Sequence, residues 1–265
     1  MADFYWDGRT SGEHLANNWQ SQDGTPLVDN YPGRFSAADR AIFEQARWSP
    51  TGGDPYATCA MATHIAAALM DAAYAGKVSA ANLEVDAITI VDGNAGARFG
   101  GGLVHTAVWG LNNNQMHDPT NIDTLTMNGP ATLMGGTIGT LTVNHASASL
   151  AGGNITKLIM NTNCLWPATP TVNTVYCYAN SATIKVGTCQ AMHIFGEAVL
   201  IDRAAFSGAK VYAYAKTLKI NTTYIYNVSI FPMRPDFQLK NSTGQMLVDA
   251  AFLAHNPMLA LGRGS

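Results

Sequence analysis

The sequence predicts an all-β protein, a single-stranded parallel β-solenoid (β-helix) with about 17 residues per coil. Three observations predict it: an apolar pattern that returns at nearly constant spacing, a second apolar position that keeps the same spacing, and strand-like alternation within each copy. The repeat is plainest where "IDTLTMNGPATLMGG", from Ile122, is followed by "IGTLTVNHASASLAGG", from Ile138.

The first pattern places small or apolar residues at positions 0, 3 and 5 of each copy. The step from Ile122 to Ile138 is one residue shorter than all later steps, which are equal. The copies are Ile122/Leu125/Met127, Ile138/Leu141/Val143, Ile155/Leu158/Met160, Val172/Val175/Cys177, Cys189/Met192/Ile194, Phe206/Ala209/Val211 and Thr223/Tyr226/Val228. Looser copies, Val85/Ile88/Ile90 and Val104/Ala107/Trp109, precede them, so we expect about nine coils between Val85 and Val228.

The second pattern is a single position that repeats with the same period. Its members are Leu133, Leu150, Pro167, Ile184, Ile201 and Leu218. The last two apolar positions of each copy of the first pattern are two residues apart, which is typical of a strand and not of a helix. Because about 17 residues leave no room for a crossover helix, we expect short parallel strands stacked about 4.8 Å apart.

Three segments follow from this reading: an irregular N-terminal cap and attachment segment over 1–80, the solenoid over 81–231, and an extended C-terminal arm over 232–265. The alanine content of residues 57–82 favours a helix. The same residues lead directly into the first coil, and we expect an irregular early rung there. Glycine pairs such as Gly135/Gly136 and Gly152/Gly153 are expected at the corners of the coils.

Stacking places equivalent residues of successive coils above one another. At position 6 the series is Asn128, Asn144, Asn161, Tyr178, Phe195 and Tyr212. It predicts an asparagine ladder that gives way to an aromatic one. Tyr178, Phe195 and Tyr212 are therefore a candidate glycan-binding platform, and mutual stacking that stabilises the coils is the alternative.

The composition argues against several classes of partner. Charged residues make up 12% of the chain, against about 25% in an average soluble domain. The net charge is -3 and no Lys/Arg cluster occurs, so we expect no nucleic acid. No apolar run reaches the roughly 18 residues of a membrane helix, so we expect no membrane partner.

We expect no catalytic residue, cofactor or metal, and therefore no enzyme activity. The four cysteines lack CxxC spacing and the seven histidines form no HExxH motif. Two carboxylate pairs, Asp118/Asp123 and Glu197/Asp202, are the candidates for glycoside hydrolysis. Neither pair recurs on a ladder beside aromatic residues, and turn or solvation roles are expected instead.

The N-terminal stretch "FYWDGRTSGEHLANNWQSQDGTPLVDNYPGRFSAADRAIF" resembles the lead-in of some bacteriophage virion proteins and of passenger-type β-solenoids. The residues that carry the resemblance are Trp6, Gly8, Asn18, Trp19, Pro32, Gly33, Asp39, Ile42 and Phe43. The following "YAGKVSAANLEV" is similar to a Tyr/Phe-x-Gly-x-Ile-Gly segment of such phage proteins. It departs from that segment at Ser79, where a second glycine would stand.

The resemblance implies a non-enzymatic structural protein of a phage particle: a capsid decoration or cement protein, a head fibre, or a collar or tail part. It implies a place in the virion after synthesis in the host cytoplasm. The expected partners are the major capsid protein or other virion proteins, and a homo-trimer is one expected assembly, although no heptad repeat indicates it. The alternatives are a glycan-binding tail fibre or tailspike and a fragment of a bacterial passenger-type adhesin.

Aromatic and apolar residues near the two ends are the candidate interface, because such residues dominate interface energies. They are Trp6, Trp19, Trp48, Met258, Leu259 and Leu261. For Trp19 and Trp48, covering the first coil is the alternative role.

Overall fold

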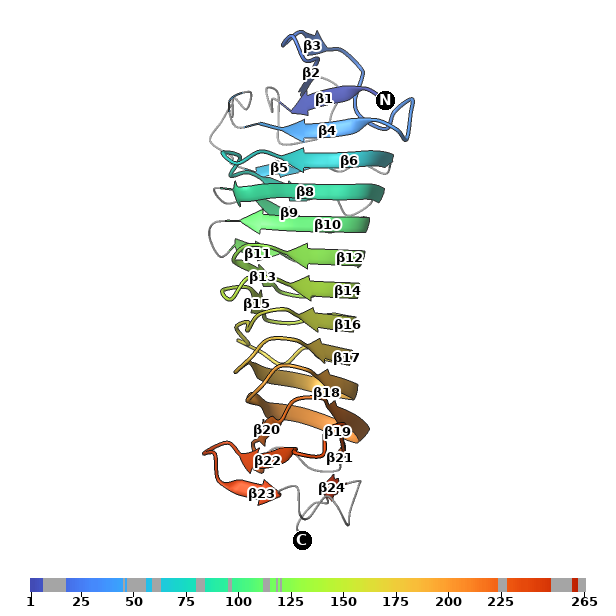
Figure 1. The fold of residues 1–265 in the computed structure, drawn as a ribbon. Helices are drawn as coiled ribbons and strands as arrows, with labels where there is room; N and C mark the ends of the chain where they lie inside the picture. Colours follow the sequence, from blue (N-terminus) through green and yellow to red (C-terminus); the bar gives the residue numbers. More distant parts are fainter. Residues whose placement is uncertain are drawn as a thin grey trace. The chain divides into compact units, whose positions relative to one another are not determined.

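The structure is a computed structural model. It describes residues 1–6, 18–44, 46, 56–58, 63–79, 84–94, 97–111, 115–117, 119, 121–223, 228–248 and 259–261. Every regular element in these ranges is a β-strand, as the all-β prediction requires. The chain divides into two compact units, Met1–Ile138 and Gly139–Ser265, and Figure 1 shows strands stacked one after another within each of them.

The first unit is built on a ladder of parallel strands. Its members are β1 (Asp3–Trp6), β4 (Arg40–Phe43), β6 (His64–Met70), β8 (Glu84–Asn94), β10 (Leu103–Leu111) and β12 (Asn121–Met127), each paired in parallel with the next. Shorter parallel strands complete the coils: β5 (Tyr56–Thr58), β7 (Lys77–Ser79) and β9 (Arg98–Gly100) in one group, β11 (Gln115–His117) and β13 (Ala131–Leu133) in another. This is the predicted β-solenoid.

The register of these strands confirms the looser early copies of the repeat. Val104 lies beside Val85 of the preceding coil and beside Ile122 of the next one. The coils on either side of β10 are therefore one or two residues longer than the middle ones. Strands β6 and β7 also replace the helix that alanine content favoured over residues 57–82, because parallel pairing with β8 and β9 satisfies their backbone groups.

The N-terminal end of the first unit is closed by antiparallel strands. Strand β1 pairs with β4 in parallel on one side and with β2 (Trp19–Gln20) antiparallel on the other, and β2 pairs with β3 (Pro26–Leu27). Parallel pairing thus begins well before residue 81, inside the segment expected to be a cap. The buried Asp39 carboxylate accepts hydrogen bonds from the N–H groups of Ala2 and Gly33 and ties these strands together.

The second unit contains two parallel ladders. The main ladder runs through β16 (Asn154–Met160), β17 (Thr171–Cys177), β18 (Thr183–Ile194), β19 (Val199–Ala213) and β21 (Val228–Pro232). The other joins the first residues of β18 and β19 to β20 (Thr217–Ile220) and β22 (Gln238–Asn241). Two further strands complete the list: β14 (Thr137–Val143), which crosses the boundary between the units, and β15 (Ser149–Leu150).

The predicted period holds in the middle of this unit and fails toward its end. Leu158, Val175 and Met192 lie in register at the expected step. Within β19 the register shifts: Cys189 lies beside Phe206 as expected, yet Met192 lies beside Val211, two positions beyond Ala209. The predicted alignment of Val211 with Ile194 is therefore wrong, because a β-bulge adds two residues to β19.

The prediction for the second repeated position is confirmed in part. Leu133, Leu150, Ile184, Ile201 and Leu218 are all buried, and Ile184 lies beside Ile201 as predicted. Leu218, however, lies beside Val199 and not Ile201. Pro167 is exposed, and Cys164 is the buried side chain of that turn, so the prediction for Pro167 is wrong.

Parts of the predicted C-terminal arm pair with the coils instead of extending from them. Strand β22 continues the ladder of β20 in parallel, and β23 (Met246–Val248) folds back on β22 antiparallel. Strand β24 (Leu259–Leu261) pairs antiparallel with β21. The last parallel strands of the second unit are thus covered by antiparallel ones.

Glycines lie at corners, as predicted. Gly136 and Gly153 have φ angles of 86° and 98°, in the left-handed region where only glycine is free of strain. At Gly196 the reason is space, because a Cβ atom there would lie 2.0 Å from the carbonyl oxygen of Ala179 in the preceding coil. The corners are as tightly fixed as the strands.

Candidate functional site

Two columns of stacked rings lie side by side on the main ladder of the second unit; we call them the aromatic strip. One column contains Tyr176, His193, Tyr212 and Phe231, with successive ring centroids 4.7, 4.9 and 5.3 Å apart. The other contains Tyr178, Phe195 and Tyr214, with centroids 4.7 and 4.5 Å apart. No comparable array of rings occurs elsewhere among the described residues.

Strand alternation and the coil register place these rings. Tyr176 and Tyr178 are two residues apart, so they point to the same side, while Cys177 between them is buried. The backbone N–H groups of Tyr178, Phe195 and Tyr214 donate to the carbonyl groups of Met160, Cys177 and Ile194, at 2.8 to 2.9 Å. This recurring hydrogen bond makes the three residues equivalent positions of successive coils.

The predicted ladder is confirmed for Asn144 and Asn161 and for two of its three aromatic residues. The Asn161 amide donates to the Asn144 side-chain oxygen at 2.8 Å, and Tyr178 and Phe195 follow them. Tyr212 belongs to the neighbouring column, and Tyr214 takes its predicted place. The two residues added in β19 cause this exchange.

The inner rings of the strip have both faces covered by neighbouring rings and present their edges to solvent. The planes of Tyr178 and Phe195 differ by 7°, and those of Phe195 and Tyr214 by 8°. Tyr178 is nevertheless 49% exposed and Phe195 37% exposed. Because the faces are occupied by neighbouring rings, the exposed part of the inner rings is the edge, where the aromatic quadrupole is positive.

A further column of the same ladder brings two lysines to the border of the strip. In register, Lys157 lies beside Thr174, Thr174 beside Ala191, and Ala191 beside Lys210. The Lys157 ammonium lies 5.0 Å from the ring centroid of Tyr176, over the first ring of the column. Lys157 and Lys210 are both exposed.

The strands that carry the strip contain a single carboxylate, and Glu197 follows Phe195 by two residues at the corner. Strands β16, β17, β18 and β21 contain no Asp or Glu. The single carboxylate of β19, Asp202, faces Lys185 at 3.1 Å and accepts from the Asn221 amide at 2.8 Å. The pKa of His193 is lowered by burial, so this member of the strip is neutral at neutral pH. The cations of the strip are therefore lysines that no carboxylate of β16, β17, β18 or β21 neutralises.

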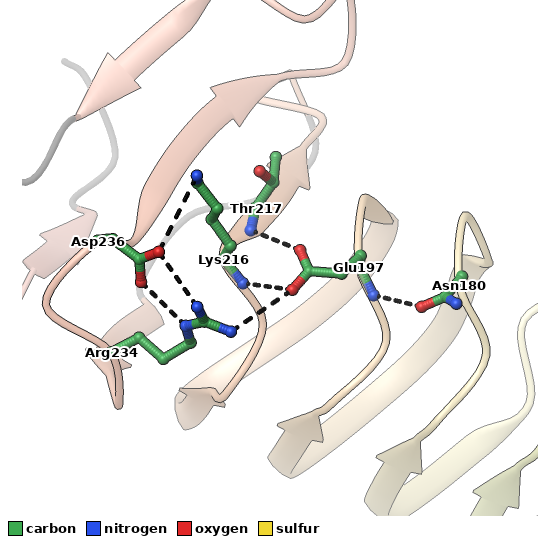
Figure 2. Close-up of polar contacts among 6 residues, drawn as sticks. All are labelled: Asn180, Glu197, Lys216, Thr217, Arg234 and Asp236. Carbon is green, nitrogen blue, oxygen red and sulfur yellow. Dashed lines mark hydrogen bonds and ion pairs between the residues drawn. The ribbon is translucent and has the colours of Figure 1, made fainter.

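The Glu197 carboxylate, one of the candidate acids, holds a corner of the coils (Figure 2). The backbone N–H of Glu197 donates to the side-chain oxygen of Asn180 in the preceding coil at 2.7 Å. Its carboxylate oxygens accept from the N–H groups of Lys216 and Thr217 in the next coil at 2.9 and 3.1 Å. The Arg234 guanidinium lies 3.9 Å away. These contacts fit the structural role expected for Glu197.

Arg234 continues this corner network into the next turn. Its guanidinium donates to both carboxylate oxygens of Asp236, at 2.9 and 3.1 Å, and so lowers the pKa of Asp236. The ammonium of Lys216 lies 4.0 Å from the same carboxylate. Side chains thus fasten successive turns at the corner as well as along the strands.

The other candidate acids lie in the first unit. Asp118 lies outside the described residues. The Asp123 carboxylate lies 2.7 Å from Nδ1 of His105, whose Nε2 lies 3.2 Å from the Glu84 carboxylate. Hydrogen bonds to Asp123 and then Glu84 raise the pKa of His105. In the part of the chain that the structure describes, no group of three or more His, Cys, Asp or Glu side chains could hold a metal ion.

Two of the predicted interface residues are buried in the first unit. Trp6 and Trp19 are 1% and 0% exposed, and their rings contact each other at 5.0 Å and also contact Phe43. For Trp19 the burial agrees with the alternative role of covering the first coil, and Trp6, for which only an interface was expected, is buried in the same cluster. Trp48 and Met258 lie outside the described residues. Leu259 and Leu261 are the ends of β24.

Buried polar residues of the first unit escaped the sequence reasoning. His117 stacks on Trp109 at 4.3 Å, and its Nδ1 accepts from the Phe99 N–H at 3.2 Å. Asn94 donates to the carbonyl of Tyr74 at 2.9 Å and accepts from the N–H of Ala97 at 2.7 Å. A single His or Asn within a polar, glycine-rich stretch carries no periodic signal, so the sequence alone indicates neither.

The cysteines of the second unit are buried free thiols: Cys164, Cys177 and Cys189. Burial raises the pKa of Cys177 to about 11 and that of Cys189 to about 12. Such thiols react slowly, because the thiolate is the nucleophile. Cys59 lies outside the described residues.

Comparisons with known proteins identify no relative: no protein-family model, no curated protein and no solved structure matches the chain. The part of the chain that the structure describes contains no helix with the length and hydropathy of a membrane span.

Proposed function

We propose that this chain is a non-enzymatic structural protein of a phage particle, a decoration, cement or fibre-like component that docks on neighbouring virion proteins through its C-terminal segment. The observation that carries the docking site is a pair of exposed apolar residues on β23. Met246 and Leu247 are 44% and 42% exposed. Within the described residues β23 pairs with β22 and with no second strand, so it is an edge strand suited to a protein contact.

The rest of the proposal has a physical basis in the coils. Hydrogen-bonded and stacked side-chain ladders, such as Asn144 with Asn161 and the corner held by Glu197, support a rigid scaffold. The low charge content suits a surface that is packed among neighbours. The proposal of a phage particle rests on the resemblance of the N-terminal stretch to phage virion proteins.

The test is the incorporation of the chain into particles. In particles purified by density gradient and quantified by mass spectrometry, we expect a fixed number of copies of the wild-type chain. The variant Met246→Ser/Leu247→Ser should fall at least tenfold in occupancy while keeping its β-sheet circular dichroism. The matched control is Met134→Ser/Leu165→Ser, which changes residues that are 42% and 50% exposed elsewhere, and it should be incorporated normally.

Two results would count against the proposal, each in a different way. Absence of the wild-type chain from particles, although the lysate contains it, would reject the particle function. Normal incorporation of the Met246→Ser/Leu247→Ser variant would reject docking through β23 and keep the particle function.

A second candidate function, a glycan-binding fibre, is favoured by the aromatic strip. Aromatic side chains in a row beside polar groups are a common arrangement for contacting sugars. A screen of immobilised host polysaccharides with the purified chain tests it, and binding without release of reducing ends is the expected result.

A further inference from the structure

We propose that the aromatic strip, with Lys157 and Lys210, binds an acidic polysaccharide. The inference rests on the second candidate function, glycan binding, and names the class of glycan. It does not depend on a place in a phage particle.

The inner rings of the strip offer a ligand their edges and not their faces. A neutral pyranose packs its apolar face on the face of an aromatic ring, but the inner rings of the strip have both faces covered by neighbours at 4.5 to 5.3 Å. At one end of a column, the ammonium of Lys157 covers the face of Tyr176. What these inner rings present to solvent is their edges, which are electropositive and attract oxygen anions.

Two lysines beside the rings add positive charge to the strip. Lys157 and Lys210 are three coils apart in one column, or about 14 Å at roughly 4.8 Å per coil. No carboxylate occurs in β16, β17, β18 or β21, and Asp202 of β19 is engaged by Lys185 and Asn221. Ring edges and ammonium groups together make a surface that is complementary to negative charge.

The spacing of charge distinguishes an acidic glycan from a nucleic acid. Duplex DNA carries one negative charge for about each 1.7 Å of its axis, and a nucleic-acid site needs several cations to neutralise it. Two lysines about 14 Å apart neutralise too few charges for duplex DNA, and each can pair with one carboxylate of an acidic sugar chain. The four tyrosine hydroxyls of the strip add hydrogen-bonding groups that suit sugar hydroxyls.

The experiment measures binding of the purified full-length chain to size-defined oligogalacturonate by isothermal titration calorimetry. Neutral dextran oligosaccharides and a single-stranded DNA of equal charge are the comparison ligands. The wild-type chain should bind oligogalacturonate at least tenfold more tightly than either. Its affinity should fall with added salt, because part of the attraction is between exposed charges.

Variants locate the site. Lys157→Gln/Lys210→Gln should weaken binding of oligogalacturonate about tenfold, a size that two exposed charge pairs can supply. The charge-matched control is Lys219→Gln/Lys240→Gln. These two lysines lie beside each other in β20 and β22 of the same unit, outside the strip, and their loss should leave binding within twofold of the wild type. Tyr178→Phe/Tyr214→Phe keeps the stacked rings and should weaken binding of the glycan without unfolding the chain.

Each contrary result has one meaning. Dextran binding as tight as oligogalacturonate binding would overturn the acidic class while keeping glycan binding. Absence of binding to either sugar would overturn both. Equal loss in the Lys219→Gln/Lys240→Gln control, or DNA bound as tightly as the glycan, would overturn the strip as a glycan site and leave only charge attraction.

Discussion

Burial keeps the side chain of His117 neutral at pH values at which an exposed histidine is charged. The ring is fully buried against Trp109, and burial, aided by the nearby charge of Arg98, lowers its pKa to about 3. The imidazole is neutral in the folded protein, with Nδ1 accepting the hydrogen bond from Phe99. A charged imidazolium could not accept that bond, since both of its nitrogens would donate.

This burial predicts a pH-dependent loss of stability. Because the pKa of His117 is lower in the folded state than its usual value of about 6.5, its contribution is complete above pH 6.5 and is lost as the pH falls toward 3. Between pH 7 and pH 4.5 the wild type should lose about 2 to 3 kcal/mol more than His117→Phe, which cannot titrate. Urea unfolding of both chains at each pH measures the difference, and parallel pH profiles would contradict the prediction.

The corner at Gly196 shows at the scale of an element how closely successive coils approach. A Cβ at Gly196 would lie 2.0 Å from a carbonyl oxygen of the coil before, and backbone cannot yield as a flexible side chain can. Two residues later Ala198 adopts a φ of 56°, which costs a non-glycine residue energy. One turn therefore contains a glycine that is required and an alanine that is strained.

The single substitutions Gly196→Ala and Ala198→Gly should change the stability of the protein by unequal amounts. Gly196→Ala should destabilise the protein by about 3 kcal/mol, because the corner must open to admit the methyl group. Ala198→Gly should change stability by less than about 1 kcal/mol, since relief of strain offsets the added freedom of the unfolded chain. Chemical denaturation of both variants provides the measurement, and each serves as a control for the other. Equal effects would show that the corner is not closely packed.

At the scale of the whole molecule, the parallel ladders have strands at their ends that need partners. At the N-terminal end of the first unit, β2 covers the free edge of β1. At the C-terminal end of the second unit, β23 covers β22 and β24 covers β21. Each added strand is antiparallel, so it occupies the edge without continuing the parallel stack, and open edges are where chains aggregate.

Removing β24 should therefore promote self-association. Deletion of residues 249–265 exposes the edge of β21, whose Val228 and Ile230 are buried in the intact chain. Light scattering after size exclusion should show a higher average mass than for the full chain, increasing with concentration. Deletion of 262–265 alone keeps β24 and is the control. Identical masses for the three proteins would contradict a capping role for β24.

The sequence alone was enough to predict the all-β class, the coil and the register of the middle coils. It could do so because stacking repeats the same environment every coil, and burial selects the same apolar residue each time, as at Leu158, Val175 and Met192. It also predicted the stacked column that contains Asn161, Tyr178 and Phe195.

The point at which that periodicity stops is visible in the folded chain and not in the sequence. A fixed period does not indicate the two added residues in β19. They move Tyr212 into the neighbouring column and bring Tyr214 into line with Phe195. Burial of Trp6 and Trp19, and the pairing of β24 with β21, depend on contacts between segments far apart in the chain. Local patterns carry no record of such contacts, because the same apolar residues suit a core and an interface equally well.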